Sequence, residues 1–145
     1  MIFILVVLVL FFAIRYYLKS KEENDQLNQN QDKKRQYLVT DFEASVTGIF
    51  YKSNVTGESR QKLIKKLEDY EPVSFKPEPS NEFDKNAVLV LNENNEDIGY
   101  LNKKVAKELT PYLNENYIID AVVEKIYKIE GGKTAILNII VREEM

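Results

Sequence analysis

Hydrophobic and polar residues divide the chain into three stretches of different character. Residues 1–14 are apolar without a break, residues 22–36 hold a single large apolar residue, and from residue 37 onward apolar and polar runs alternate. The first pattern is typical of a helix in a membrane, the second of a segment that cannot order itself, and the third of a packed domain. We therefore predict an anchor over residues 1–18, a flexible polar tether over 19–36 and one domain over 37–145.

The predicted anchor is long enough to cross a membrane. Residues 1–18 would span about 27 Å as an α-helix if Arg15 extends to the interface. Arg15, Lys19 and Lys21 all follow the apolar run, so the positive-inside rule places the N-terminus outside and the domain in the cytoplasm. A cleaved signal peptide would carry its charge before the apolar core, and a buried or amphipathic helix would need a polar face. We expect a single-pass membrane protein.

Within the domain, short apolar runs separated by turn residues predict six strands. The runs lie at 42–51, 73–75, 87–91, 98–101, 117–129 and 134–141. Residues 92–97 form a polar turn between the third and fourth, and Gly131 with Gly132 suits a hairpin between the last two. In the first strand, alternation places Val46 and Phe50 on one face and Ile49 and Tyr51 on the other.

Two helices are predicted between these strands. The first begins at residues 56–59. Its apolar side chains are predicted to face the core: Leu63, Ile64, Leu67 and Tyr70. Its four cations are expected in solvent, with a phosphate site as the alternative: Arg60, Lys62, Lys65 and Lys66. The second helix is capped by Asn102 and bends or ends near Thr110 because of Pro111. Lys103 and Lys104 oppose the dipole of its first turn, so they are either a solvated face or placed for a phosphate.

These elements predict a mostly β fold with two helices, a small OB- or SH3-like β-barrel that follows an N-terminal transmembrane helix. The chain has no cysteine and no histidine. Disulfides, thiolate metal sites and the commonest general base are therefore excluded. Glu78 and Asp84 could pair as carboxylates, but no base, metal cluster or phosphate-binding glycine loop accompanies them. We expect neither an enzyme nor a cofactor.

The charge of the domain argues against broad electrostatic capture of DNA. From residue 37 onward the chain has 14 Lys and Arg against 19 Asp and Glu, a formal charge of −5. Proteins that bind duplex nucleic acid usually carry a basic surface. Any nucleic-acid contact must therefore be local.

The segment before the third strand reads as a stiff, shaped loop. Pro77 and Pro79 favour extended backbone and remove two amide donors, while Asn81 and Asp84 are side chains that bond nearby backbone in turns. Phe83 lies among them, where an exposed turn seldom places a large ring. Two interpretations stay open. Either Phe83 packs under the loop and Asp84 caps backbone amides, or both face a ligand.

This part of the chain resembles the HIRAN domain family. The resemblance rests on Glu78-Pro79, the run NEFDKNA at 81–87, a strand and polar turn, the run IGYL at 98–101, and a following helix that holds Ala106 and Leu109. It covers roughly residues 42–123. It implies the same small β-barrel.

The resemblance also implies a ligand, the 3′ end of a single-stranded DNA or RNA. By position, Phe83 would stack on a base, Asp84 would accept from the terminal hydroxyl and Asn81 would support them. Tyr100 would form a wall and Lys103 would contact phosphate. The predicted nucleic-acid-binding residues are Asn81, Phe83, Asp84, Tyr100, Lys103 and Lys104.

One segment departs from the family pattern. The resemblance implies an arginine and adjoining tyrosines just before Thr47-Gly48, where this chain has Ala44, Ser45 and Val46. The predicted function is a membrane-tethered, non-enzymatic module that binds nucleic-acid ends. The alternative is a protein-interaction module that binds a peptide or a partner protein at the membrane surface.

Overall fold

The computed structural model describes residues 14–21, 37–115 and 117–143. The chain separates into two units, one ending at Gln36 and the other formed by Tyr37–Glu144. In the first unit, residues 14–21 are helical, including residues 19–21, which the sequence assigns to the predicted tether. No helix among the described residues is long and apolar enough to span a bilayer. Most of the predicted anchor and tether lies outside the described residues.

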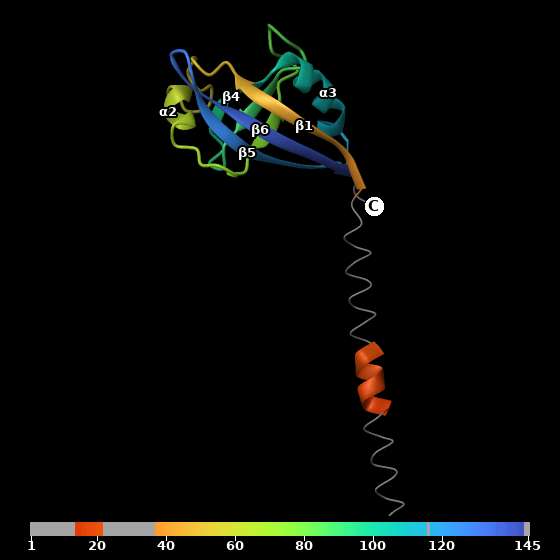
Figure 1. Ribbon diagram of the computed structural model, residues 1–145. Coiled ribbons are helices and arrows are strands. Elements are labelled where there is room, and N and C mark those ends of the chain that lie inside the picture. The colour runs from red at the N-terminus through yellow and green to blue at the C-terminus, as the bar shows by residue number, and fades with distance from the viewer. Residues whose placement is uncertain (1–13, 22–36, 116, 144–145) are drawn as a thin grey trace, which may run out of the picture. The chain divides into compact units, whose positions relative to one another are not determined.

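The second unit is built on one curved sheet of six antiparallel strands (Figure 1). The strands are β1 Tyr37–Thr47, β2 Ser74–Pro77, β3 Val88–Leu91, β4 Asp97–Leu101, β5 Tyr117–Ile129 and β6 Gly132–Glu143. Their order in the sheet is β2-β3-β4-β1-β6-β5. The segment before β2 forms hydrogen bonds with β5, the strand at the opposite edge of the sheet. The Tyr70 amide donates to the Val123 carbonyl at 2.6 Å, and the Val73 amide donates to the Ala121 carbonyl at 3.0 Å. The predicted barrel is thus a curled sheet whose edges are bridged over a short stretch.

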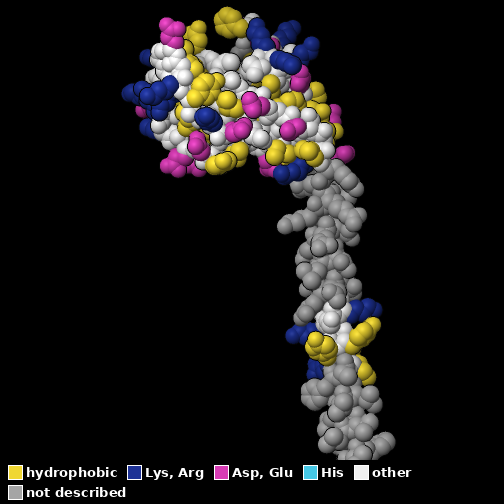
Figure 2. Space-filling view, in the orientation of Figure 1, with side chains coloured by type: hydrophobic (Ala, Val, Ile, Leu, Met, Phe, Trp, Pro, Cys, Tyr) yellow, Lys and Arg dark blue, Asp and Glu magenta, His cyan; other side chains and the backbone are white. Residues whose placement is uncertain are grey.

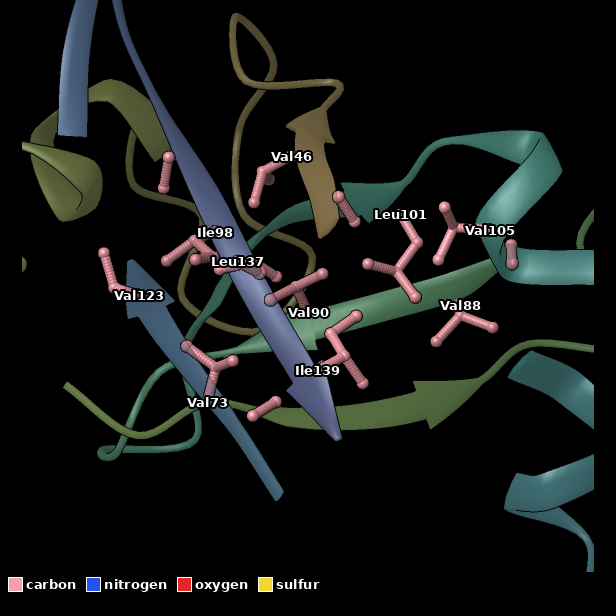
Figure 3. Close-up of a cluster of buried hydrophobic side chains, with 14 of the residues drawn as sticks. Val46, Val73, Val88, Val90, Ile98, Leu101, Val105, Val123, Leu137 and Ile139 are labelled. Carbon is pink, nitrogen blue, oxygen red and sulfur yellow. The ribbon is translucent and has the colours of Figure 1, made fainter. Parts of the chain in front are cut away.

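Alternating apolar residues of the strands fill the inside of this sheet. In β1, Ala44 and Val46 are buried while Glu43 and Thr47 are exposed, as a period of two requires. Figure 3 shows Val46, Leu101, Val123 and other core side chains from five strands and the second helix pointing toward one another. Eight strand residues of the core have no exposed surface: Val88, Val90, Ile98, Val123, Ala135, Leu137, Ile139 and Val141.

Gly99 explains the close approach of β4 to β1. Its φ of 149° is unfavourable for other residues, and a Cβ there would lie 2.3 Å from the Thr47 carbonyl oxygen. The two strands pair only at their ends, with Val46 opposite Leu101 and Thr47 opposite Tyr100. The approach places Tyr100 beside the end of β1.

The two predicted helices are present, with different lengths from those expected. The first, α2, covers only Arg60–Ile64, and the second, α3, covers Lys103–Leu113. The Asn102 side chain accepts a hydrogen bond from the Val105 amide at 3.0 Å, as the cap was predicted to do. Pro111 lies inside α3, which continues to Leu113 and does not end near Thr110.

Three local predictions about β1 and α2 were wrong. The first strand ends at Thr47 rather than residue 51, because Gly48 turns the chain with a φ of 66°, and Phe50 and Tyr51 are exposed. Tyr70 is not turned inward, since α2 ends before it and Tyr70 also adopts a φ of 66°. Arg60 is buried rather than in solvent.

Candidate functional site

A groove of about 1090 Å³ lies at one end of the curled sheet. One wall is the loop between β2 and β3, residues 78–87, and the other is the segment that leads from the end of β1 into α2, residues 47–60. Tyr100 of β4, Lys103 of α3 and Lys76 of β2 also line the groove. Figure 1 shows both walls on the same side of the sheet.

Residues 78–87, the display loop, are held by short-range hydrogen bonds. Across its base the Glu78 amide donates to the Ala87 carbonyl at 2.8 Å. The Asn81 side-chain oxygen accepts from the amides of Phe83 at 3.0 Å and Asp84 at 3.2 Å. Asp84 Oδ1 accepts from the Asn86 amide at 2.9 Å. The loop is therefore shaped without the help of its aromatic ring.

Phe83 stands out from the display loop and is 90% exposed. This contradicts the interpretation in which the ring packs inward, because the Asn81 side chain fixes the turn and the ring stays in solvent. Asp84 does cap an amide, as the scaffold interpretation required. Only one of its oxygens does so, and Oδ2 makes no hydrogen bond to any described residue.

Tyr100 forms the back of the groove and is fixed from both sides. Its hydroxyl donates to Glu78 Oε2 at 2.9 Å and accepts from the Asn54 side chain at 2.9 Å. The same Glu78 oxygen accepts from the Asn81 side chain at 3.3 Å. Burial and the neighbouring Glu78 carboxylate raise the pKa of Tyr100. The phenol therefore stays protonated and joins the two walls.

A buried ion pair lies behind Tyr100. Arg60 and Asp97 are 2% and 0% exposed, and Asp97 Oδ2 accepts from Arg60 Nη2 at 2.6 Å and from Nε at 3.0 Å. Arg60 Nη1 also donates to the Gly48 carbonyl at 3.0 Å. The guanidinium carbon lies 5.0 Å from the centre of the Tyr100 ring, within the range of a cation–π contact.

Asp97 also fastens the segment between β1 and α2. Its Oδ1 accepts from the Ser53 hydroxyl and from the Val55 amide at 2.9 Å, and its Oδ2 accepts from the Asn54 amide at 3.1 Å. Burial by itself raises the pKa of Asp97, but these hydrogen bonds and the one from Arg60 outweigh burial and lower it. Asp97, predicted to be the last residue of the polar turn, is the first residue of β4 and is buried.

The groove gathers five of the six predicted site residues: Asn81, Phe83, Asp84, Tyr100 and Lys103. Lys104 is exposed and does not line it. Sequence reasoning missed other lining residues: Tyr51, Asn54, Arg60, Lys76 and Glu78 as a partner of Tyr100. A signal for Arg60 did exist, because it occupies the position that begins the apolar stripe of Leu63, Ile64 and Leu67.

The HIRAN domain family model matches residues 39–138. The chain belongs to the HIRAN domain family. The crystal structure of the HIRAN domain of human HLTF superposes with a TM-score of 0.58 at 24% identity, covering 75% of this chain and 80% of that one. A protein from Lactobacillus plantarum superposes with a TM-score of 0.55 at 15% identity, covering 70% of this chain and 98% of that one. No curated protein matches the chain.

These comparisons confirm the family resemblance and the mostly β fold. The matched residues include both walls of the groove. At these identities the solved structures establish the fold of this HIRAN domain, and its groove has to be interpreted from its own side chains.

Proposed function

We propose that this HIRAN domain binds the 3′ end of a single-stranded nucleic acid in its groove, as a non-enzymatic module held at a membrane by residues 1–18. The observation that carries the proposal is the 90% exposed ring of Phe83, displayed on a loop that does not need it. Exposing a phenylalanine ring to water is unfavourable, so a ring fixed in this way suits a stacking partner. Stacking on an aromatic ring stabilises a bound base by about 1 to 3 kcal/mol.

The polar groups of the groove favour an end that carries a hydroxyl. The free Oδ2 of Asp84 can accept one hydrogen bond from such a group. A terminal phosphate would instead meet the carboxylates of Asp84 and Glu78, both of which line the groove. Lys76 and Lys103 also line it and can neutralise the phosphate that links the last nucleotides. Few phosphates need to be contacted, which fits a domain of formal charge −5.

The test uses the full-length chain, in mild detergent if it requires one, and a short 5′-labelled single strand that ends in a 3′-hydroxyl or a 3′-phosphate. Fluorescence anisotropy should show tighter binding of the hydroxyl form, and Phe83→Ala should weaken that binding roughly 5- to 150-fold. Tyr70→Ala is the matched control, because Tyr70 is an exposed ring that does not line the groove. Equal binding of both ends by the wild-type chain would refute the end-binding function. Capture of a membrane protein in the same preparation would then favour the protein-interaction alternative.

Membrane attachment needs a separate test. The apolar residues 1–14 and the basic residues that follow them support an anchor with the domain on the cytoplasmic side. The protein should stay with membranes after a carbonate wash, and a reporter fused to its C-terminus should be active only in the cytoplasm. Release into the wash, or a shortened N-terminus, would show that the anchor is absent.

A further inference from the structure

Tyr51 is a second exposed ring, on the wall opposite Phe83. It lines the groove and is 73% exposed. Its hydroxyl makes no hydrogen bond to any described residue, yet its backbone is fixed, because the Tyr51 carbonyl accepts from the Arg60 amide at 3.2 Å. The Tyr51 ring is thus exposed to solvent, while the hydrogen bond from the Arg60 amide holds its backbone in place on the wall.

Cations gather on and next to α2, the helix whose first residue bonds to the Tyr51 carbonyl. The backbone of Lys52 forms a β-bridge with the backbone of Ser59 just before the helix. Lys62 lies within the helix, and Lys65 and Lys66 follow it. All four are exposed, and none forms an ion pair with a described residue. Figure 2 shows Lys and Arg side chains gathered over α2 at the left of the view. We call these four residues the α2 lysines.

The α2 lysines are an exception in an acidic domain. Residues 52–66 hold five cations and a single acid, Glu58, whereas the whole domain is formally −5. The fifth cation, Arg60, is already paired with Asp97. The four lysines therefore keep their charge available for a ligand, and a phosphate backbone is the ligand that exposed lysines next to an exposed ring suit best.

We propose that a single strand whose end lies in the groove leaves it over Tyr51 and continues onto the α2 lysines. The site would then take a run of several unpaired nucleotides rather than an isolated end. This inference rests on the end-binding function proposed above, and it adds a path for the rest of the strand.

Charge and aromatic placement select this path over the other exits. The display loop presents the carboxylates of Glu78, Glu82 and Asp84 along its side of the groove, which repel a phosphate backbone. The start of α3 also carries lysines, Lys103 and Lys104, but no large hydrophobic side chain is exposed between residue 84 and residue 143 of the described chain. Among the exits formed by described residues, only the Tyr51 side offers both an exposed ring and a group of lysines.

The experiment is a length series with the full-length chain. Single strands of two, four and eight thymidines with a free 3′-hydroxyl are titrated at several salt concentrations. We expect affinity and salt dependence to increase from two to eight nucleotides, with the salt slope rising by roughly 0.7 for each added phosphate contact. Tyr51→Ala should weaken the longer strands roughly 5- to 150-fold.

The lysines are tested with a matched pair of variants. Lys62→Gln with Lys66→Gln should remove most of the gain with length and lower the salt slope, while the dinucleotide still binds. Lys107→Gln with Lys125→Gln changes the charge equally at exposed positions outside the groove and outside the α2 lysines. This control should keep the gain with length. Tyr70→Ala serves as the control for Tyr51→Ala.

The outcomes separate this inference from the proposed function. If the dinucleotide binds with preference for a 3′-hydroxyl but longer strands bind no better, the exit path is wrong and the end-binding function stands. If the control pair of lysines lowers the gain as much as the α2 pair, the effect is overall charge and the path is again wrong. If no strand binds, both proposals fall. Binding of anionic phosphatidylglycerol vesicles through the α2 lysines, without any effect of strand length, would assign that surface to lipid instead.

Discussion

The display loop and the wall opposite it face the same groove but are held in place by different interactions. In the loop, Asn81 and Asp84 bond to amides two or three residues further along the chain. In the opposite wall, Arg60 reaches across to Asp97, 37 residues away, and both groups are buried. One wall is shaped by its own sequence, and the other depends on the packing of β1, α2 and β4.

The difference shows that some aromatic residues of the groove are available for binding alone, whereas others also hold the fold together. The ring that is displayed, Phe83, makes no structural contribution that its loop requires. The ring at the back, Tyr100, is tied to Glu78, Asn54 and the Arg60 guanidinium. Substitutions on the two walls should therefore differ strongly in their cost to folding.

The largest effect is expected at the buried pair. Arg60→Ala leaves the Asp97 carboxylate buried without its cation, which should lower the free energy of unfolding by about 3 to 5 kcal/mol. Chemical denaturation of wild type and variant measures the change. Lys62→Ala, one exposed lysine on the same helix, should change it by less than about 0.5 kcal/mol. If Arg60→Ala lowers the free energy of unfolding as little as Lys62→Ala does, the Arg60–Asp97 pair does not stabilise this wall.

The pH dependence of stability should carry the signature of Asp97. Because its pKa is lowered in the folded state, its contribution is fully present above a pH of about 4 and is lost as the pH falls through the folded value. Stability measured by denaturation at pH values between roughly 5 and 2 should fall more steeply for wild type than for Asp97→Asn. Parallel curves would mean that this carboxylate titrates alike in the folded and unfolded chain.

A smaller effect is expected in the display loop. Asn81→Ala removes the acceptor for the amides of Phe83 and Asp84, which should cost about 0.5 to 2 kcal/mol. The loop is solvent-accessible, so water can replace part of the loss. Asn81→Asp keeps an acceptor oxygen and should recover most of the stability, as thermal unfolding can show. Failure of Asn81→Asp to recover it would point to the Glu78 contact instead.

The smallest effect on folding is expected at Phe83. Phe83→Ala should change the free energy of unfolding by less than about 0.5 kcal/mol, because the ring is 90% exposed. Thermal unfolding provides the measurement. A loss of several degrees would mean that the ring packs against the domain in solution, and its role as a free stacking surface would be wrong.

Local chemistry explains which parts of the site could be predicted from the sequence. The runs NEFDKNA and IGYL carry the family resemblance, and the turn-forming residues of the first run indicated a loop shaped by side-chain to backbone bonds. The cap at Asn102 and the hairpin at Gly131 follow from residues that lie next to one another in the chain. The six predicted site residues were carried over from the family resemblance, and five of them line the groove.

The pairing of Arg60 with Asp97 could not be predicted in this way, although Arg60 begins the apolar stripe of its helix. Each looked like an ordinary surface charge, one on a basic helix and one in a polar turn. A charge is buried only when a partner and further hydrogen bonds compensate its desolvation, and those partners come from segments far apart in the sequence. Tyr51 was missed because the predicted strand ran four residues too far, past the turn at Gly48 that brings its ring to the groove.

The sequence by itself therefore determined the periodic elements and the display loop, because turns, caps and alternating strands depend on neighbours within a few positions. It indicated most of the groove residues through the motifs that carry the family resemblance. Only the tertiary structure decided that Phe83 is exposed, that Arg60 pairs with Asp97 behind Tyr100, and that Tyr51 faces the display loop. The physical reason is that burial depends on how β1, α2 and β4 pack, and no local pattern of residues encodes which distant charge will neutralise another.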